Sequence, residues 1–93
     1  MINLYQKTWK EINTGIASRM ISLRKRKKIS QQELAVRSGV SMGSVKRFEQ
    51  SGEISLKSLT KIAIALGAEG ELDTLFEDVP FASIEEVIYG QSE

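Results

Sequence analysis

The stretch 31–50, QQELAVRSGVSMGSVKRFEQ, limits the possible folds of this chain more than any other. The stretch has two segments in which apolar residues recur at helical spacing, and a serine precedes each of them, at Ser30 and Ser41. A serine hydroxyl in that place accepts a hydrogen bond from a helical N–H that has no other partner. Glu33 completes an S-x-x-E capping box with Ser30. Gly39 stands where a left-handed residue ends a helix. The stretch therefore predicts two short helices joined by a tight turn.

Apolar spacing indicates how these two helices are buried. Leu34 and Ala35 are the apolar positions of the first helix, and Val45 and Phe48 share a face of the second. Val40 is expected to fill the turn between them. The second helix carries a different set on its opposite face, namely Gly43, Lys46, Arg47 and Gln50, with Met42 and Ser44 on the flanks. The pattern predicts one anchored face and one free face.

The stretch resembles the helix-turn-helix of the lambda-repressor-like (Xre/Cro-type) family of DNA-binding regulators. The residues that carry this resemblance are Gln31, Leu34, Ala35, Gly39, Val40, Ser41, Val45, Phe48 and Glu49. It continues into LRKRKK before the stretch and into S-L-x-S-L-x-K-I-A-x-A-L-G after it, and so covers roughly residues 16–67. The resemblance implies an all-α, five-helix DNA-binding domain with a short C-terminal helical extension.

The segment before the stretch is predicted to form a first helix. Thr8 and Glu11 form a T-x-x-E capping signature. Apolar residues follow at helical spacing, namely Ile12, Ile16, Met20 and Leu23. Thr14 and Gly15 interrupt this series, which leaves open whether the helix starts or kinks there. We expect it to end near Lys27.

Three further helical segments are expected after the stretch. Ser51 and Gly52 close the second helix of the motif. Ser55 caps a helix of about twelve residues that is stopped at Gly67, and its apolar stripe is Leu56, Leu59, Ile62, Ala63 and Leu66. A short fifth helix over 71–76 is expected to pack its apolar residues, Leu72, Leu75 and Phe76. After Pro80, Ser83 and Glu86 predict one more helical turn or two.

Charge divides the chain into two parts. The segment 19–61 holds eleven Lys or Arg residues and three acids, a balance of +8, whereas the segment 68–93 holds eight acids and no basic residue. A basic half is typical of nucleic-acid binding, and an acidic half indicates a separate surface. We accordingly expect a DNA-binding domain over 1–77 and an acidic segment over 78–93 for dimer or partner contact.

The residue inventory argues against catalysis and membrane insertion. The chain has no histidine and no cysteine, so zinc sites, Ser-His-Asp triads and cysteine nucleophiles are excluded. The glycines do not follow phosphate-loop spacing. We therefore expect no enzyme activity, cofactor or metal. No apolar run approaches membrane-spanning length and no secretory region precedes the domain, which predicts a cytoplasmic protein.

The second helix of the motif is the predicted base-reading element, because an α-helix fits the major groove of B-DNA. Arg47 is predicted to contact a guanine edge, Ser44 to bond a base and Met42 to pack on a thymine methyl. Gly43 lacks the polar side chain often found at its position in the family, yet it lets the backbone approach the DNA. These four residues are the predicted base contacts.

Other polar residues are predicted to contact phosphates, which position a protein without specifying sequence. They are Gln31, Lys46, Gln50, Arg26, Lys27 and Lys28. The resemblance implies the contact of Gln31, assisted by the N-terminus of its helix. It also implies that Arg24 faces inward and pairs with Glu49.

The function predicted from these features is sequence-specific binding of double-stranded DNA by a transcriptional repressor. It would act as a homodimer on a palindromic operator. An alternative function is that of an antitoxin, because KRFEQSGEISLKSL followed by an acidic, apolar tail resembles Xre-type antitoxins. Those proteins repress their own operon and bind a toxin, including HipA-like kinases. A third reading is a protein-interaction module without DNA binding.

Overall fold

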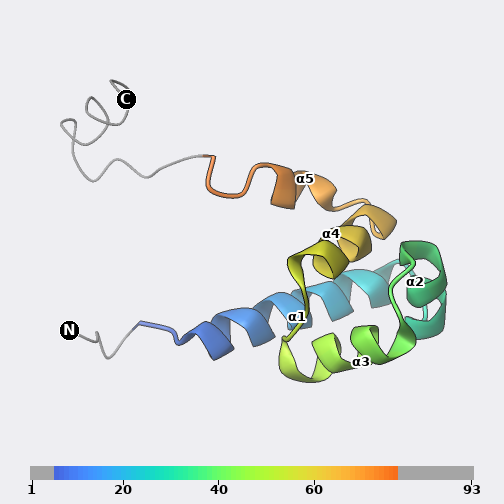
Figure 1. Ribbon diagram of the computed structural model, residues 1–93, viewed down its shortest axis with the longest axis horizontal. Helices are drawn as coiled ribbons and strands as arrows, with labels where there is room; N and C mark the ends of the chain where they lie inside the picture. The colour runs from blue at the N-terminus through green and yellow to red at the C-terminus, as the bar shows by residue number, and fades with distance from the viewer. Residues whose placement is uncertain (1–5, 78–93) are drawn as a thin grey trace.

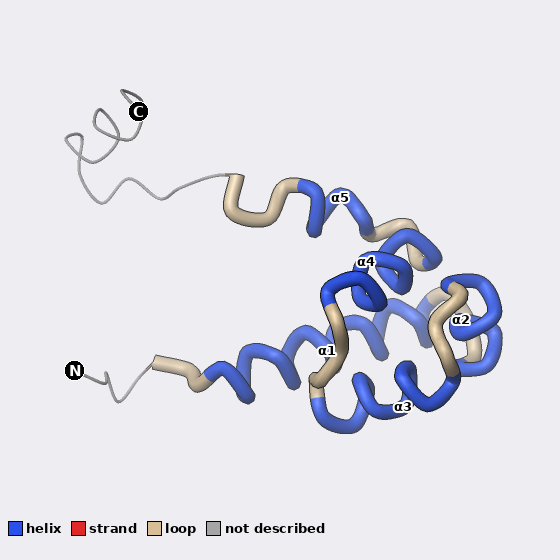
Figure 2. Tube along the Cα trace, viewed as in Figure 1, coloured by secondary structure: helices blue, strands red, loops and turns tan. Residues whose placement is uncertain are grey.

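The computed structural model describes residues 6–77, and all regular structure in that range is helical (Figures 1 and 2). The helices are α1 (Trp9–Arg26), α2 (Gln31–Ser38), α3 (Met42–Ser51), α4 (Leu56–Ala65) and α5 (Glu69–Asp73). The predicted all-α, five-helix architecture is therefore confirmed. None of these helices is long and apolar enough to cross a membrane. The helical turn expected after Ser83 lies outside the described residues.

Helix α1 begins with a complete capping box. The Thr8 hydroxyl accepts from the Glu11 amide at 3.1 Å, and the Glu11 carboxylate accepts from the Thr8 amide at 3.4 Å. The helix then runs without interruption to Arg26, so the start considered near Thr14 is wrong. The Thr14 hydroxyl donates to the Lys10 carbonyl at 2.9 Å and is accommodated within the helix.

Serine caps begin the next three helices as predicted. The hydroxyls of Ser30, Ser41 and Ser55 accept from the amides of the N3 residues at 3.0, 3.1 and 3.1 Å. The predicted capping box at Ser30 also requires the Glu33 carboxylate to accept from the Ser30 amide, and this part of the prediction is wrong. The Glu33 carboxylate pairs instead with Arg37, one turn later.

The core lies where α1, α2, α3 and α4 meet. Its most deeply buried large side chains are Phe48, Leu34, Ile62 and Val45. The remaining buried apolar residues are Ala17, Met20, Ile29, Val40 and Leu66. Helix α1 packs on α3, α2 packs on both α3 and α4, and α5 packs on α4. Figure 1 shows the first turns of α1 extending beyond α2, α3 and α4. The helix-turn-helix, formed by α2 and α3, thus packs against both α1 and α4.

Three apolar residues that were expected to pack are exposed instead. Leu56 is 69% exposed, Leu75 is 54% and Phe76 is 88%. Helix α5 ends at Asp73 rather than near Phe76, and Phe76 has a positive φ of 68°. Helical spacing fixes which residues share a face, but a face is buried only where another element covers it. No described element covers these side chains.

Candidate nucleic-acid interface

Helix α3 is anchored along one face and free along the other. Val45 is fully buried and Phe48 is 1% exposed, so this face is fixed against α1 and α2. On the outward side four residues are exposed, namely Gly43, Lys46, Arg47 and Gln50, while Met42 and Ser44 are half-buried. The Ser41 cap and the left-handed Gly52 define the two ends of the helix. The predicted base-reading residues therefore lie together on one rigid element.

The first turn of α3 presents small and polar groups. The Ser41 and Ser44 hydroxyls are hydrogen-bonded to each other at 2.8 Å, and a hydroxyl can both donate and accept, so Ser44 retains capacity for a ligand. A Cβ atom at Gly43 would meet nothing within 4 Å. Because Gly43 is helical and has open space beside it, the fold itself does not require a glycine here. The backbone of this turn is therefore accessible to close approach by another molecule.

Arg47 lies on the outward face of α3 with its side chain 71% exposed. Its Nη2 atom donates to Oε2 of Glu53 at 3.3 Å, across the turn that follows the helix. These two side chains line a shallow pocket together with Ser44, Ile54, Ser55 and Ser58. Glu53 was not among the site residues predicted from the sequence. The sequence pattern that precedes this contact is an acid placed six residues after an arginine and directly after a glycine that ends a helix.

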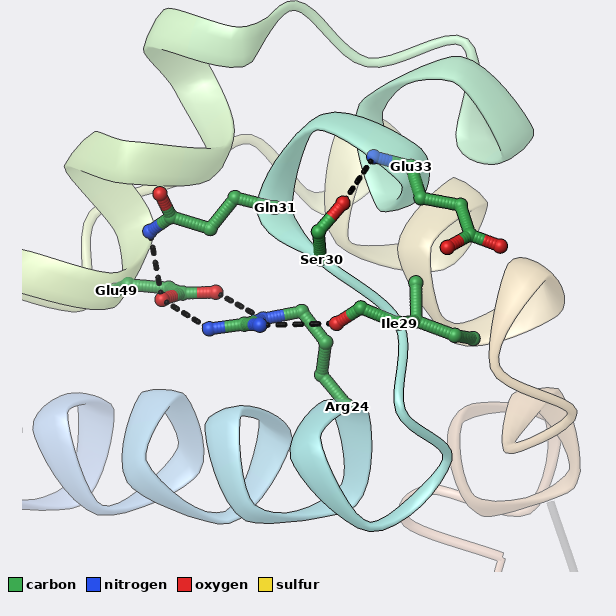
Figure 3. Close-up of polar contacts among 6 residues, drawn as sticks. All are labelled: Arg24, Ile29, Ser30, Gln31, Glu33 and Glu49. Atoms are coloured by element: carbon green, nitrogen blue, oxygen red, sulfur yellow. Dashed lines mark hydrogen bonds and ion pairs between the residues drawn. The ribbon is translucent and has the colours of Figure 1, made fainter.

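Arg24 and Glu49 form a buried ion pair that joins α1 to α3 (Figure 3). The Nε atom of Arg24 donates to Glu49 Oε2 at 2.8 Å, and Nη2 donates to Oε1 at 3.0 Å. The third nitrogen, Nη1, donates to the Ile29 carbonyl at 3.0 Å. The two side chains are only 9% and 7% exposed. This is the inward pairing implied by the family resemblance, and it fixes the orientation of α3.

Gln31 joins the same network through a contact that was not predicted from the sequence. Its Nε2 atom donates to Glu49 Oε1 at 2.9 Å from the first residue of α2 (Figure 3). The amide nitrogen carries two hydrogens, so one N–H remains for another acceptor. Gln31 therefore links α2 to the ion pair, and its side chain can bind a phosphate only with the remaining N–H.

The basic residues that follow the core-facing part of α1 are exposed at its C-terminal end. They are Lys25, Arg26, Lys27 and Lys28. Lys28 has a positive φ of 58°. Its backbone N–H donates to the Lys25 carbonyl at 2.9 Å, and the backbone N–H of Ile29 donates to the Arg24 carbonyl at 3.1 Å. These two bonds form a Schellman motif, whose left-handed position is usually a glycine. The structure thus places a charged side chain at a strained turn beside the start of α2.

Each acid in the basic half of the chain is paired with an arginine. Glu49 pairs with Arg24, Glu33 with Arg37 and Glu53 with Arg47. The lysines of residues 6–77 form no ion pair with another residue in that range. They remain available for phosphate, and they carry most of the positive charge of this half.

A sequence model of the helix-turn-helix family matches residues 20–71, more than half of the chain. The chain belongs to the lambda-repressor-like (Xre/Cro-type) helix-turn-helix family. It is accordingly a DNA-binding helix-turn-helix regulator. The match begins within α1 and ends within α5. Neither the search of curated proteins nor the search of solved structures found a match.

Proposed function

We propose that this helix-turn-helix regulator is a transcriptional repressor that binds a palindromic operator as a homodimer, with α3 in the major groove. The observation that carries this proposal is the arrangement of α3. Val45 and Phe48 hold its inner face in the core, while Arg47 and Lys46 extend from its outer face. A rigid helix with a free polar face is the form in which this class of protein reads base edges.

The outward residues of α3 divide into two proposed groups. Arg47 has the reach and the fork of donors for guanine O6 and N7, and the Ser44 hydroxyl can bond either a donor or an acceptor on a base edge. Met42 is proposed to pack on a thymine methyl beside the open backbone of Gly43. The proposed phosphate contacts are Lys46, Gln50, Arg26, Lys27, Lys28 and the second N–H of Gln31. The first group would set sequence preference, and the second would set affinity.

The proposed dimer is supported by the distribution of apolar and acidic residues. One α3 contacts too few base pairs for useful specificity, and a two-fold dimer places two such helices about 34 Å apart on the duplex. Ile64, Leu75 and Phe76 are exposed on α4 and the segment after α5. This region also carries four described acids, namely Glu69, Glu71, Asp73 and Glu77. Its charge opposes phosphate, so we place the protein–protein contact there.

The same apolar and acidic region supports a second candidate, an antitoxin that represses its own operon and binds a toxin there. Exposed large apolar residues such as Phe76 mark protein contacts when they gather on one surface. The two candidates differ in what occupies the surface. A homodimer would cover it with a second copy, whereas an antitoxin would leave room for the product of a neighbouring gene.

The primary experiment selects binding sites for the full-length protein from a pool of random duplexes. We expect a palindrome whose half-sites are about one helical turn apart. With six to ten phosphate contacts, the logarithm of affinity should fall against the logarithm of salt with a slope of about −5 to −9. Failure to enrich any sequence at low salt would leave only the protein-interaction reading.

Two substitutions test the proposed division of roles. Arg47→Ala should cost about 1–3 kcal/mol of binding free energy and relax the preference at one base pair. Lys46→Ala should weaken binding to all sequences by a similar factor and reduce the salt slope by about one. Unchanged affinity and preference in Arg47→Ala would show that the reading face of α3 is wrongly assigned.

Oligomeric state separates the two candidates. Sedimentation should show a dimer both free and on the operator, and Phe76→Ser should shift it towards monomer without unfolding it. A monomer at high micromolar concentration in both states would reject the dimer. Co-purification of a neighbouring gene product with the wild type, lost in Phe76→Ser while the dimer persists, would favour the antitoxin.

A further inference from the structure

The pairing of Glu53 with Arg47 is the one ion pair among residues 6–77 that engages a proposed base-reading side chain. Glu53 follows Gly52, whose left-handed conformation turns the chain back from the end of α3. The carboxylate reaches Arg47 Nη2 at 3.3 Å, and the two side chains are 54% and 71% exposed. An acid therefore stands on the side of α3 that carries the base-reading residues.

Stability does not account for this pair. An ion pair that is so exposed contributes little to folding, because water competes for both charges and two long side chains must be ordered. The turn after α3 is already fixed by other bonds. Gly52 donates to the Phe48 carbonyl at 2.8 Å, and Glu53 donates its amide to the Ser51 hydroxyl at 3.2 Å. The turn therefore does not depend on the Glu53 carboxylate, whose contact is with Arg47.

The contact engages one nitrogen of the Arg47 guanidinium. Arginine recognises guanine with two parallel N–H donors, so the plane of the guanidinium must be fixed for both bonds to form. Glu53 engages one N–H of Arg47, and four others remain. A guanidinium held at one nitrogen loses less conformational freedom on binding than a freely rotating one.

We infer that Glu53 is a positioning residue that orients Arg47 for a guanine contact and thereby sets the base preference of α3. This inference rests on the proposed contact of Arg47 with DNA. The Glu53 carboxylate also repels phosphate and so weakens binding to every sequence. The two effects together favour the cognate site, because only there is the repulsion offset by an oriented arginine.

The test compares Glu53→Gln with the wild type on two duplexes. One carries the selected operator, and the other has adenine in place of the guanine whose preference depends on Arg47. We expect Glu53→Gln to bind the adenine duplex about threefold more tightly, since one repulsive charge is gone. We expect the guanine preference, on the order of tenfold or more in the wild type, to fall about threefold or more.

Two further variants separate positioning from charge. Glu33→Gln makes the same change of charge at an exposed arginine pair on α2, and it should leave the guanine preference unaltered. In an Arg47→Lys background, which lacks the fork of donors, Glu53→Gln should have no further effect on preference.

The outcomes distinguish this inference from the function on which it rests. If no duplex is enriched by the wild type, the proposed function fails first. If the operator binds but Glu53→Gln shifts both duplexes equally, Glu53 acts only as a charge and the inference is overturned. It is also overturned if Glu53→Gln still changes the preference when Arg47 is lysine, because Glu53 would then act on the base without Arg47.

Discussion

A Cβ atom at Gly52 would lie 2.8 Å from the carbonyl carbon of Asn13, closer than packed atoms can approach. The end of α3 therefore rests directly on the backbone of α1. Gly39 ends α2 with a similar φ, 72° against 78° at Gly52, but has nothing within 4 Å of its own Cβ position. The two glycines share a backbone conformation and differ in the space around them.

This difference predicts unequal losses of stability in the two alanine variants. Gly39→Ala should lower the free energy of unfolding by about 1–2 kcal/mol, the strain of a left-handed alanine. Gly52→Ala should lose that amount and about 1–3 kcal/mol more, because α1 and α3 must separate to admit the methyl group. Urea denaturation of both variants measures the difference. Equal losses would show that the contact with Asn13 relaxes freely.

Removal of Glu49 should destabilise the domain far more than removal of another paired acid. Glu49→Ala strands the buried Arg24 and also removes the acceptor of Gln31, which predicts a loss of about 3–5 kcal/mol. The control Glu33→Ala breaks an exposed pair with Arg37 and should lose less than about 1 kcal/mol. Thermal unfolding monitored by circular dichroism compares them. Similar small losses would contradict the structural role of the buried pair.

Lys28 should show opposite effects on stability and on DNA binding. Lys28→Gly relieves a left-handed lysine at the end of α1, which predicts a gain of about 1 kcal/mol in the free energy of unfolding. If Lys28 contacts a phosphate, the same variant should reduce the salt slope of DNA binding by about one. Thermal melts and salt titrations provide the two measurements. A stabilised variant with an unchanged slope would remove Lys28 from the phosphate contacts.

Gly43→Ala should also separate folding from binding. Alanine is better than glycine inside a helix by about 1 kcal/mol, and the open space beside Gly43 admits a methyl group. The variant should therefore melt at a higher temperature. If the backbone of α3 approaches the DNA closely at Gly43, operator affinity should decrease despite the gain in stability. An affinity equal to that of the wild type would reject close approach at this residue.

Local sequence predicted much of the fold, because helix ends are decided by neighbouring residues. Thr8, Ser41 and Ser55 cap their helices as expected, and each does so through a hydroxyl placed three residues before the amide it bonds. Burial of Val45 and Phe48 followed equally well from their spacing within α3. These features depend on at most one or two turns of chain.

The remaining features depend on elements that are distant in the sequence. Gln31 bonds Glu49 eighteen residues away, a contact that no local pattern encodes. Leu75 and Phe76 have the composition of a core segment but lack a described partner. Arg47 was correctly placed on the outward face of α3, yet its contact with Glu53 depends on the turn made by Gly52. Tertiary placement, rather than propensity, decides each of these.

The ion pair of Arg24 with Glu49 has a consequence for hydrogen exchange. Its bonds join α1, α3 and the Ile29 carbonyl before α2, and breaking any one exposes a desolvated charge without its partners. Local opening of α3 alone is therefore strongly disfavoured relative to opening of the whole helical unit. We expect the amides of α3 from Val45 onwards, which bond within the helix, to exchange as slowly as those in the buried part of α1. The proposed DNA-contacting face of α3 would then open only together with the rest of the helical unit.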